Sequence, residues 1–290
     1  MIISVITPSY NREKLLINAY NSLLKQSNKS FEWIIVDDGS KDNTGILVTN
    51  LINDKKINIK YIKKENGGKH TALNKGIDEA SGELIIILDS DDFLTDDAIE
   101  TILDDWRLYE NNEKICGISY QRKLINGPKS KSLPQSPYIS NHIECRYNQE
   151  FYADRAEVYR TDVMQRFKFP VFEKERFLSE TIVWNKIAME YDMVYIDKEI
   201  YVCEYQNDGL TANSQKTRVN NPIGAMENYR IMMKKPFKFK LRIKYSILYN
   251  TFSKFANIPF LKSLDKENKL LLILTRPIGD IVYMKYKKYK

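Results

Sequence analysis

Short apolar runs alternate with amphipathic helical stretches through the first 120 residues, and this alternation constrains the fold more than any other feature of the chain. Helical patterns fill 12–25, 43–53, 70–80 and 95–109, and the β-rich runs lie at 2–7, 32–37, 57–62, 83–88 and 114–119. Strands that are apolar throughout are typical of a parallel sheet covered by helices on both faces. We therefore predict a doubly wound α/β domain.

Polar clusters follow the ends of the first four predicted strands. In chain order they read TPSYNR, DDGSKDNT, KKENGGKH and DSDD. In open α/β sheets, ligands bind outside the carboxyl ends of the strands. We therefore expect the four clusters to line one edge of the sheet and to form a ligand site there.

The last of these clusters places Asp89, Asp91 and Asp92 together with no Lys or Arg among them. Two like charges about 4 Å apart repel by roughly 4 kcal/mol at an effective dielectric near 20. A divalent cation such as Mn²⁺ or Mg²⁺ offsets that repulsion, and it usually takes one or two carboxylates together with substrate phosphates. Capping of a helix that begins near residue 95 is the alternative for Asp92, but it does not explain Asp89.

Two further clusters have open alternatives. Asp37 and Asp38 either form a turn with a helix cap or accept hydrogen bonds from a base or a ribose. Gly67 and Gly68 precede a helix, so their amides could approach a phosphate, and Lys69 could add a point charge. Loop-to-helix junctions favour glycine in any case, so this signal is weak by itself.

Glu180 begins an apolar helical stretch in FLSETIVWNKIA. A carboxylate in a first helical turn is ordinary for a cap, here with Ser179 beside it. The same position suits a partly desolvated general base. From the local residues alone, both roles stay open and the cap is favoured.

The motifs TPSYNR, VDDGSKDNT, NGGKHTALNKGI and LDSDD, in this order and at these intervals, resemble inverting glycosyltransferases of family 2, of the bacterial surface-polysaccharide type. The resemblance is strong over residues 2–110 and looser to about 205. It implies the GT-A fold, which has a Rossmann-like, mostly parallel sheet with helices on both faces.

The resemblance also implies roles for individual residues. Asp89 and Asp91 match the DxD motif, whose second acid binds the metal, Mn²⁺ or Mg²⁺. The donor is a nucleotide sugar, a UDP-sugar by this resemblance, with Lys69 near the uridine. The nucleotide pocket is shaped by Thr7, Pro8, Tyr10 and Asp38.

The acceptor side departs from the family pattern at two places. Glu180 falls where these enzymes carry a Glu-Asp pair bearing the general base, but Thr181 replaces the Asp. QKTRV at 215–219 is similar to the Q-x-x-R-W signature of processive synthases, with Val219 in place of Trp. Arg218 would contact the diphosphate when the loop predicted at 208–218 closes.

The rest of the chain suggests two domains. We predict a catalytic domain over 1–220, with a nucleotide-sugar half at 1–110 and an acceptor half at 111–220, and a basic helical region over 221–290. A surface loop is expected at 121–150, where Pro, Ser and Lys are frequent. Further strands are predicted at 151–159, 193–197 and 199–205, and further helices near 161–167, 179–190, 222–234 and 237–256.

The charge is concentrated in the C-terminal region. Residues 236–290 carry 13 basic and 3 acidic residues, a net charge of +10, whereas the whole chain carries +7. A helical stripe in this region consists of Leu241, Tyr245, Leu248, Phe252 and Phe255. Residues 234–260 could therefore lie on an anionic membrane surface, or the stripe could pack on the catalytic domain. The helical spacing of the aromatic residues does not favour nucleic-acid binding.

The sequence predicts an enzyme that transfers a sugar to a hydroxyl of a glycan or lipid-linked acceptor in cell-surface glycan synthesis. A sugar nucleotidyltransferase is the runner-up, although it would place a Gly-rich basic loop after the first strand. A non-catalytic nucleotide- or carbohydrate-binding module is the other alternative. Without a leader-like N-terminus or a long apolar run, we expect a cytoplasmic protein, free or peripheral on the inner face of the plasma membrane. The sequence does not specify an oligomeric state.

Overall fold

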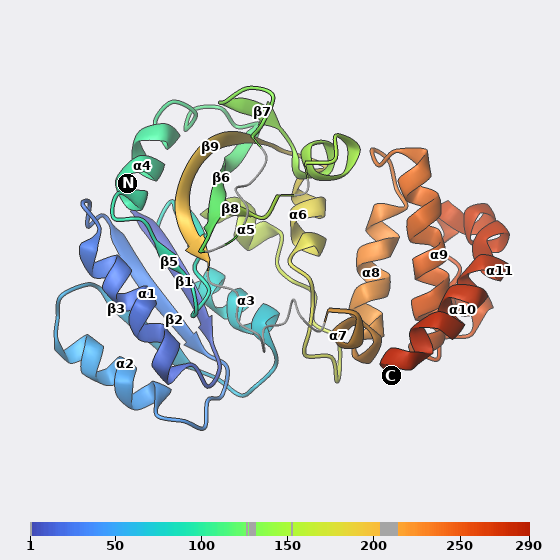
Figure 1. The fold of residues 1–290 in the computed structure, drawn as a ribbon, viewed down its shortest axis with the longest axis horizontal. Helices are drawn as coiled ribbons and strands as arrows, with labels where there is room; N and C mark the ends of the chain where they lie inside the picture. Colours follow the sequence, from blue (N-terminus) through green and yellow to red (C-terminus); the bar gives the residue numbers. More distant parts are fainter. Residues whose placement is uncertain (1, 126, 128–131, 152, 204–213) are drawn as a thin grey trace.

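A computed structural model describes residues 2–125, 127, 132–151, 153–203 and 214–290 (Figure 1). The first part of the chain forms β1 Ile3–Ser9, α1 Glu13–Lys25, β2 Phe31–Asp37, α2 Thr44–Asn53, β3 Ile59–Lys63, α3 Lys69–Glu79, β4 Leu84–Ile87, β5 Phe93–Leu94, α4 Ala98–Trp106 and β6 Ile115–Leu124. The middle forms β7 Tyr138–Ser140, the π-helix η1 Ile143–Asn148, β8 Arg155–Arg160, α5 Thr161–Arg166, α6 Thr181–Ile187 and β9 Asp192–Cys203. The last part forms α7 Ser214–Asn220, α8 Pro222–Met232, α9 Phe239–Phe255, α10 Phe260–Ser263, η2 Lys266–Asn268, α11 Lys269–Tyr286 and η3 Lys287–Tyr289.

A single sheet organises the first two thirds of the chain. Its strand order is β3-β2-β1-β4-β8-β6-β9-β5, and β7 pairs with β9. Of the nine strands in the described residues, β1 to β4, β6 and β9 run in one direction, and the other three run against them. The predicted mostly parallel α/β sheet is therefore confirmed, with antiparallel pairs in its second half.

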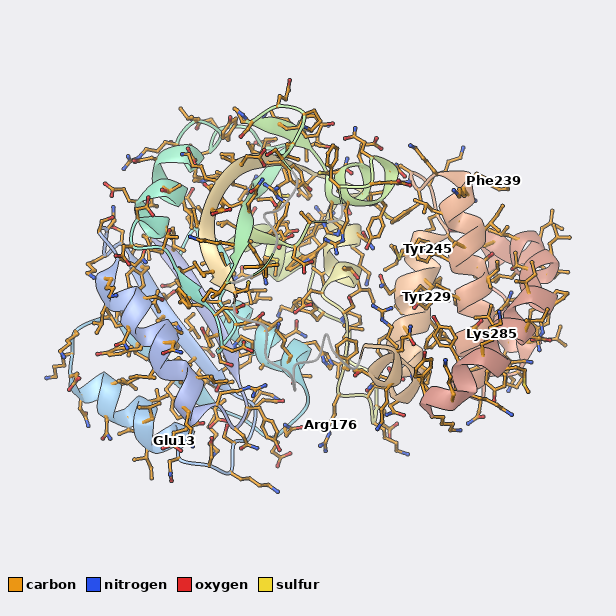
Figure 2. The ribbon with its side chains drawn as sticks, in the orientation of Figure 1. Glu13, Arg176, Tyr229, Phe239, Tyr245 and Lys285 are labelled. Carbon is orange, nitrogen blue, oxygen red and sulfur yellow. The ribbon has the colours of Figure 1, made fainter. Side chains whose placement is uncertain are left out.

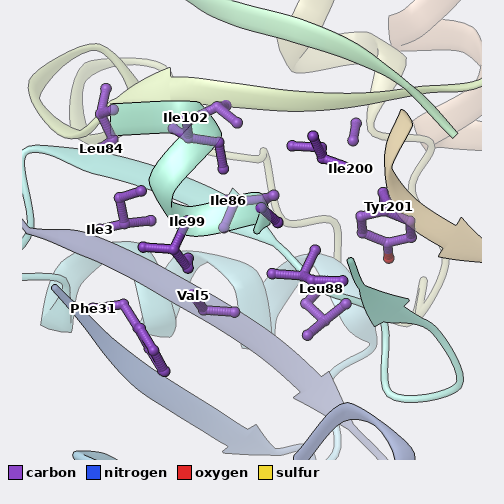
Figure 3. Packing of buried hydrophobic residues seen from close by; sticks show 14 of the residues in the cluster. Ile3, Val5, Phe31, Leu84, Ile86, Leu88, Ile99, Ile102, Ile200 and Tyr201 are labelled. Atoms are coloured by element: carbon purple, nitrogen blue, oxygen red, sulfur yellow. The ribbon is translucent and has the colours of Figure 1, made fainter. Parts of the chain in front are cut away.

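Helices cover both faces of this sheet, as the apolar strands predict. In β1, Ile3 and Val5 face a core that includes α1 and α4, whereas Ile6 faces a second core built with α3, α5 and α6. Figure 3 shows part of the first core, with Ile99 and Ile102 of α4 packed over Ile3, Val5 and Ile86. Each fully buried Ile or Val side chain contributes about 1.5–3 kcal/mol to folding.

The region from 121 to 150 differs from the predicted surface loop. Strand β6 continues to Leu124, β7 forms at 138–140, and η1 follows at 143–148. Ile143 is fully buried and Cys145 is nearly so, because apolar residues lie between the Pro and Ser residues that suggested a loop. The local composition did not reveal β7, which pairs with β9. Residues 126 and 128–131 of the predicted loop lie outside the described residues.

The two strands predicted at 193–197 and 199–205 belong to one strand, β9, as far as Cys203, and residues 204 and 205 lie outside the described residues. Asp197 and Lys198 look like a break, but the pairing of β9 with β6 passes them with a register shift. Asp197 accepts hydrogen bonds from Gln121 Nε2 at 2.7 Å and from the Leu133 amide at 2.8 Å. These long-range partners keep a polar residue inside a continuous strand.

The C-terminal helices form a separate layer beside the sheet, with α11 outermost (Figure 1). Tyr229 of α8 stacks on Tyr245 of α9 with ring centroids 5.9 Å apart (Figure 2). Phe252 is fully buried, and Phe255 lies 4.6 Å from the ring of Tyr283 in α11. The stripe predicted in 234–260 therefore packs mainly against α8 and α11, within the helical region, and it meets the sheet domain through Tyr147 of η1.

This helical region also contacts the sheet domain. Its core includes Ile143 and Tyr147 of η1 and Ala188 just after α6. Among the described residues, no helix combines the length and the apolar character needed to span a membrane.

Candidate active site

The carboxyl ends of the parallel strands meet at one edge, as predicted. Ser9 at the end of β1 pairs with Asp37 at the end of β2, and Asp37 pairs with Lys63 at the end of β3. Strand β4 is the other neighbour of β1, so the Asp cluster at 89–92 follows at the same edge. The four polar clusters therefore converge.

Asp38 organises the glycine loop at this edge. Its carboxylate accepts hydrogen bonds from the amides of Gly67 at 2.9 Å and Gly68 at 2.7 Å. Lys64 Nζ lies 2.7 Å from the same carboxylate, which is buried. The two glycine amides are thus bound to Asp38 instead of pointing toward an open phosphate position.

The other residues implied for the nucleotide pocket lie on or beside β1. Thr7 is fully buried, and its hydroxyl accepts a hydrogen bond of 2.9 Å from Trp33 Nε1. Pro8 lies within the strand, next to Val36 of β2. Tyr10 is exposed just beyond the strand end. Of these side chains, Tyr10 is the one open to solvent at the edge.

Gly68 brings the start of α3 against the chain segment that leads to Glu180. Its backbone has φ of +93°, a conformation that glycine adopts without steric cost. A Cβ atom at this position would lie 2.0 Å from the carbonyl oxygen of Arg176. Only a residue without a side chain permits so close an approach of the two segments.

Lys69 then joins two of the predicted site residues. Its Nζ lies 2.6 Å from Asp89 Oδ1 and 2.8 Å from Glu180 Oε1. Burial alone would lower the pKa of the ammonium group, but the charges of Asp89 and Glu180 outweigh it and raise the pKa above its ordinary value. Lys69 is therefore a permanent cation between the end of β4 and the start of α6.

Glu180 occupies the N-cap position of α6, yet its side chain makes no capping hydrogen bond. Its carboxylate reaches across to Lys69 instead. The neighbouring Thr181 hydroxyl lies 2.8 Å from Ser179 Oγ and accepts a hydrogen bond of 3.1 Å from Asn228 in α8. The cap explanation for Glu180 thus lacks its defining contact, and Thr181 ties the start of α6 to the helical region.

The acidic cluster separates into three different environments. Burial raises the pKa of Asp89, but Lys69 and Arg122 outweigh this, so the pKa is lowered and the group stays ionised. Burial, followed by repulsion from Asp89 and Asp91, raises the pKa of Asp92 to about 6. Burial, followed by the charge of Asp89, also raises the pKa of Asp91.

Asp91 is the carboxylate best suited to a divalent cation. It forms no ion pair with any side chain in the described part of the chain, and its ionised form is disfavoured until a positive charge arrives. In those same residues, no group of three His, Cys, Asp or Glu side chains converges as a ready ligand set. A single carboxylate is a donor that Mn²⁺ or Mg²⁺ accepts from a protein when substrate phosphates supply further oxygen ligands.

Sequence reasoning missed Tyr201 and Arg122. The Tyr201 hydroxyl accepts a hydrogen bond of 2.9 Å from the Asp89 amide and donates one of 2.9 Å to Asp92. The Arg122 guanidinium lies 4.4 Å from the centroid of the Tyr201 ring. The two hydrogen bonds of Tyr201 join residues 112 and 109 positions apart, and Arg122 lies on a different strand from Tyr201, so no local pattern could reveal these contacts. A basic residue near the end of the strand predicted at 114–119 was the one available signal.

A cavity of about 230 Å³ lies between the start of α6 and the helical region, and its wall includes the two sequence neighbours of Glu180 but not Glu180 itself. Its lining includes Ser179, Thr181, Arg146, Arg218, Asn228 and Tyr229, with no acidic side chain. Arg218 lies on α7, and both Arg218 and Tyr229 line this cavity. The loop predicted at 208–218 is helical from residue 214 onward, and 208–213 lies outside the described residues. A larger hollow of about 460 Å³, lined by Phe31 and Ile59, lies at the opposite end of the sheet.

Comparison with known proteins gives the family. The family model described as glycosyl transferase family 2 matches residues 4–174. An uncharacterized glycosyltransferase of Rickettsia felis is 35% identical over 199 residues, which cover 68% of this chain and 32% of that protein. The chain thus spans about a third of the length of that relative.

A second relative matches along most of its length. It is the GalNAc(5)-diNAcBac-PP-undecaprenol beta-1,3-glucosyltransferase of Campylobacter jejuni, 28% identical over 238 residues. The match covers 79% of this chain and 74% of that enzyme.

Solved structures share the fold. S. aureus TarS 1–349 in complex with UDP-GlcNAc superposes with a TM-score of 0.62 at 21% identity, covering 95% of this chain and 79% of that one. The mannosyltransferase PcManGT from Pyrobaculum calidifontis, in complex with GDP-Man and Mn²⁺, gives 0.58 at 14% identity, covering 97% and 86%. With the family model, the GT-A-like neighbours and the strand-end site in agreement, this chain belongs to glycosyl transferase family 2.

Proposed function

We propose that this protein transfers a sugar from a UDP-sugar to a hydroxyl of a glycan or lipid-linked acceptor, with inversion at the anomeric carbon. The observation that carries the proposal is the bridge in which Lys69 contacts both Asp89 and Glu180. Through Lys69, the Asp89 carboxylate on the proposed donor side is connected to Glu180, the proposed general base.

On the donor side, we assign the nucleotide to the edge formed by Thr7, Pro8, Tyr10 and Asp38. Thr7 and Asp38 would act by fixing the backbone, because their side chains are bound within the protein. The UDP-GlcNAc complex of TarS supports a uridine nucleotide.

Asp91 would hold Mn²⁺ or Mg²⁺, with Asp89 beside it. The metal would neutralise charge on the diphosphate leaving group. The GDP-Man and Mn²⁺ complex of PcManGT supports a metal in this fold. Burial and repulsion from Asp89 make the Asp91 carboxylate receptive to a cation.

On the acceptor side, Glu180 is the proposed general base. It takes the proton of an acceptor hydroxyl while the oxygen forms a bond to the anomeric carbon. The bond from that carbon to the diphosphate breaks on the opposite face, and the nucleoside diphosphate leaves. Lys69 is a positioning residue that holds the Glu180 carboxylate toward the donor acids.

The cavity beside Glu180 is the proposed acceptor subsite. Its wall contains Ser179 and Thr181, the sequence neighbours of the proposed base, and Asn228 and Arg218 supply hydrogen-bond donors from α8 and α7. Arg218 is also the proposed contact to the diphosphate. The name of the Campylobacter jejuni relative, which acts on an undecaprenol-linked glycan, supports a lipid-linked acceptor.

We propose that residues 1–220 form the catalytic unit and that 221–290 form a helical region appended to it. The contact between Thr181 and Asn228 supports a structural role for α8 at the acceptor side.

The test is a screen of UDP-sugars for release of UDP, with and without Mn²⁺. We expect metal-dependent release with at least one donor, and a loss of about 10³-fold in the Glu180→Gln variant. Glu190→Gln is the control, because Glu190 lies in an exposed ion pair with Arg166. UDP binding should survive in Glu180→Gln, measured by thermal stabilisation. Binding without turnover in the unmodified protein would instead favour a non-catalytic binding module.

A further inference from the structure

The outermost helix, α11, exposes an apolar stripe along its whole length. The stripe, called the α11 stripe below, consists of Leu270, Ile273, Leu274, Ile278, Ile281 and Met284. These positions follow the three- and four-residue steps of one helix face. Leu270 is 71% exposed and Leu274 is 67% exposed, so the helical region does not cover this face.

The opposite face of α11 is fixed against α9. Leu272 is fully buried, and its carbonyl oxygen accepts a hydrogen bond of 2.9 Å from Asn250 Nδ2. Thr251 Oγ1 donates to the carbonyl of Gly279 at 3.1 Å. A Cβ atom on Gly279 would lie 2.7 Å from Asn250 Cβ, so the two helices are in close contact. The α11 stripe therefore cannot turn inward without breaking this packing.

Exposed lysines stand at both ends of the stripe. Lys266 and Lys269 precede it, and Lys285, Lys287, Lys288 and Lys290 follow it. Residues 260–290 hold 8 basic and 3 acidic residues. Two of the acidic residues are already paired, Glu267 with Lys234 at 2.8 Å and Asp280 with Lys254 at 2.7 Å. The surface around the stripe is therefore strongly positive.

Other large apolar side chains that are exposed in the sheet domain come from separate segments of the chain. Ile46 lies on α2, Leu108 follows α4, and Val171 lies between α5 and α6. Single exposed apolar residues are normal on protein surfaces, whereas a contiguous apolar patch marks an interaction site. The α11 stripe is of the second kind.

We propose that α11 lies in the interface of an anionic lipid membrane. The stripe would enter the boundary between headgroups and acyl chains, and the flanking lysines would contact phosphate and other acidic headgroup oxygens. A second copy of this chain would bring like charges against these lysines, so an anionic bilayer is the partner that matches both the apolar face and its surroundings. This inference does not depend on the proposed sugar transfer.

The membrane surface thus lies on a different helix from the one indicated by the sequence. The apolar stripe in 234–260 is packed inside the helical region, and the stripe that remains open belongs to α11. Lys285, near one end of α11, lies on this outer helix in Figure 2.

The test is co-sedimentation of the full chain with two kinds of vesicle, phosphatidylcholine alone and phosphatidylcholine mixed with phosphatidylglycerol. We expect binding to the mixed vesicles at low salt, loss of binding at high salt, and little binding to phosphatidylcholine alone. The double variant Leu274→Glu, Ile281→Glu should bind at least about tenfold more weakly.

The matched control is Ile46→Glu, Leu108→Glu, which adds the same charge at exposed apolar positions of the sheet domain. It should bind like the unmodified protein. Lys285→Gln, Lys288→Gln should lose the preference for the anionic lipid. Circular dichroism and thermal midpoints of all variants show whether they fold.

Unchanged vesicle binding by a folded Leu274→Glu, Ile281→Glu variant would overturn the proposal. So would a concentration-dependent dimer, seen by light scattering, that forms without vesicle binding and disappears in that variant. Loss of vesicle binding with UDP release intact separates this inference from the proposed enzyme activity.

Discussion

At the carboxyl ends of the strands, lysines are paired with carboxylates inside the fold, whereas the lysines around α11 are exposed beside apolar side chains. Lys64 contacts Asp38, and Lys69 contacts Asp89 and Glu180. Lys285 and Lys288 are exposed at the end of an uncovered helix face. Lysines thus form ion pairs within the protein in one region, whereas in the other region they remain exposed and could contact an external partner.

A second contrast lies within the helical region itself. The stripes of α9 and α11 have the same helical spacing and both have basic neighbours, yet one is buried and the other is exposed. Whether a stripe is buried depends on whether its helix lies between two other helices. Helix α9 packs between α8 and α11, whereas α11 has a neighbour on one face. Amphipathicity therefore indicates that a face needs a partner, and the tertiary arrangement decides which partner it has.

The largest effect is expected from Phe252→Ala in the buried stripe. Truncation of a fully buried Phe should reduce the free energy of unfolding by about 3–5 kcal/mol. Leu274→Ala in the α11 stripe should change it by less than about 0.5 kcal/mol. Urea unfolding followed by circular dichroism measures both, and equal losses would remove the distinction between the two stripes.

Lys69→Met should come next in size. It leaves Asp89 and Glu180 without their shared cation, so we expect turnover to fall by about 10²-fold, roughly 2.7 kcal/mol in the barrier. Steady-state kinetics should show the loss mainly in kcat, and Lys69→Arg should recover part of it. Lys75→Met is the control, since that lysine pairs with Glu79 on an exposed helix surface. A change confined to KM would contradict a positioning role for Lys69.

Gly68→Ala tests the contact between α3 and the segment before Glu180. The new Cβ would overlap the Arg176 carbonyl oxygen, so we expect a loss of about 1–3 kcal/mol in stability together with reduced turnover. Asn50→Ala, at an exposed position of α2, should be neutral or slightly stabilising. Thermal unfolding and UDP release measure the pair. A stable, fully active Gly68→Ala variant would show that the contact does not set the site.

The smallest effect is the dependence of stability on pH that comes from His142, which lies where η1 meets the helical region. Burial, followed by the charge of Arg146, lowers the pKa of His142 to about 3, and the imidazole packs edge-on against Tyr147. An unfolded His takes up a proton near pH 6.5, while the folded one stays neutral. The neutral His142 side chain therefore makes its full contribution to the free energy of unfolding above about pH 6.5. This contribution declines as the pH falls toward about 3.

At about pH 5.5 this linkage costs on the order of 1 kcal/mol of stability. Unfolding of His142→Gln should lack that part of the acid dependence, whereas a residual slope is expected because burial also lowers the pKa of His70. Unfolding curves between neutral and mildly acidic pH provide the measurement. An identical pH slope in the variant would exclude His142 as the source.

The sequence predicts most of the strand-end half, because there each strand, turn and helix is determined locally. The clusters at Asp38, Lys69 and Asp89 each follow one apolar run, and parallel pairing brings them together. The fold class and the convergence of these clusters could therefore be predicted from apolar periodicity alone.

What could not be predicted depends on contacts between distant segments. Tyr201 reaches Asp92 across 109 positions, and Asp197 stays within β9 because Gln121 binds it from 76 positions away. The role of Glu180 has the same origin, since its partner Lys69 comes from another element. Local residues could only present a cap and a base as alternatives.

The close contact of Gly68 with the Arg176 carbonyl has a consequence for engineering. It acts as a fixed joint between the half that would recognise the donor and the half that would select the acceptor. Chimaeras that exchange acceptor specificity should therefore keep the 64–69 and 176–181 segments from the same parent, and should recombine outside them. Exchanges that cut between these two segments would alter the spacing between the proposed leaving group and the proposed base, whatever the quality of the new acceptor pocket.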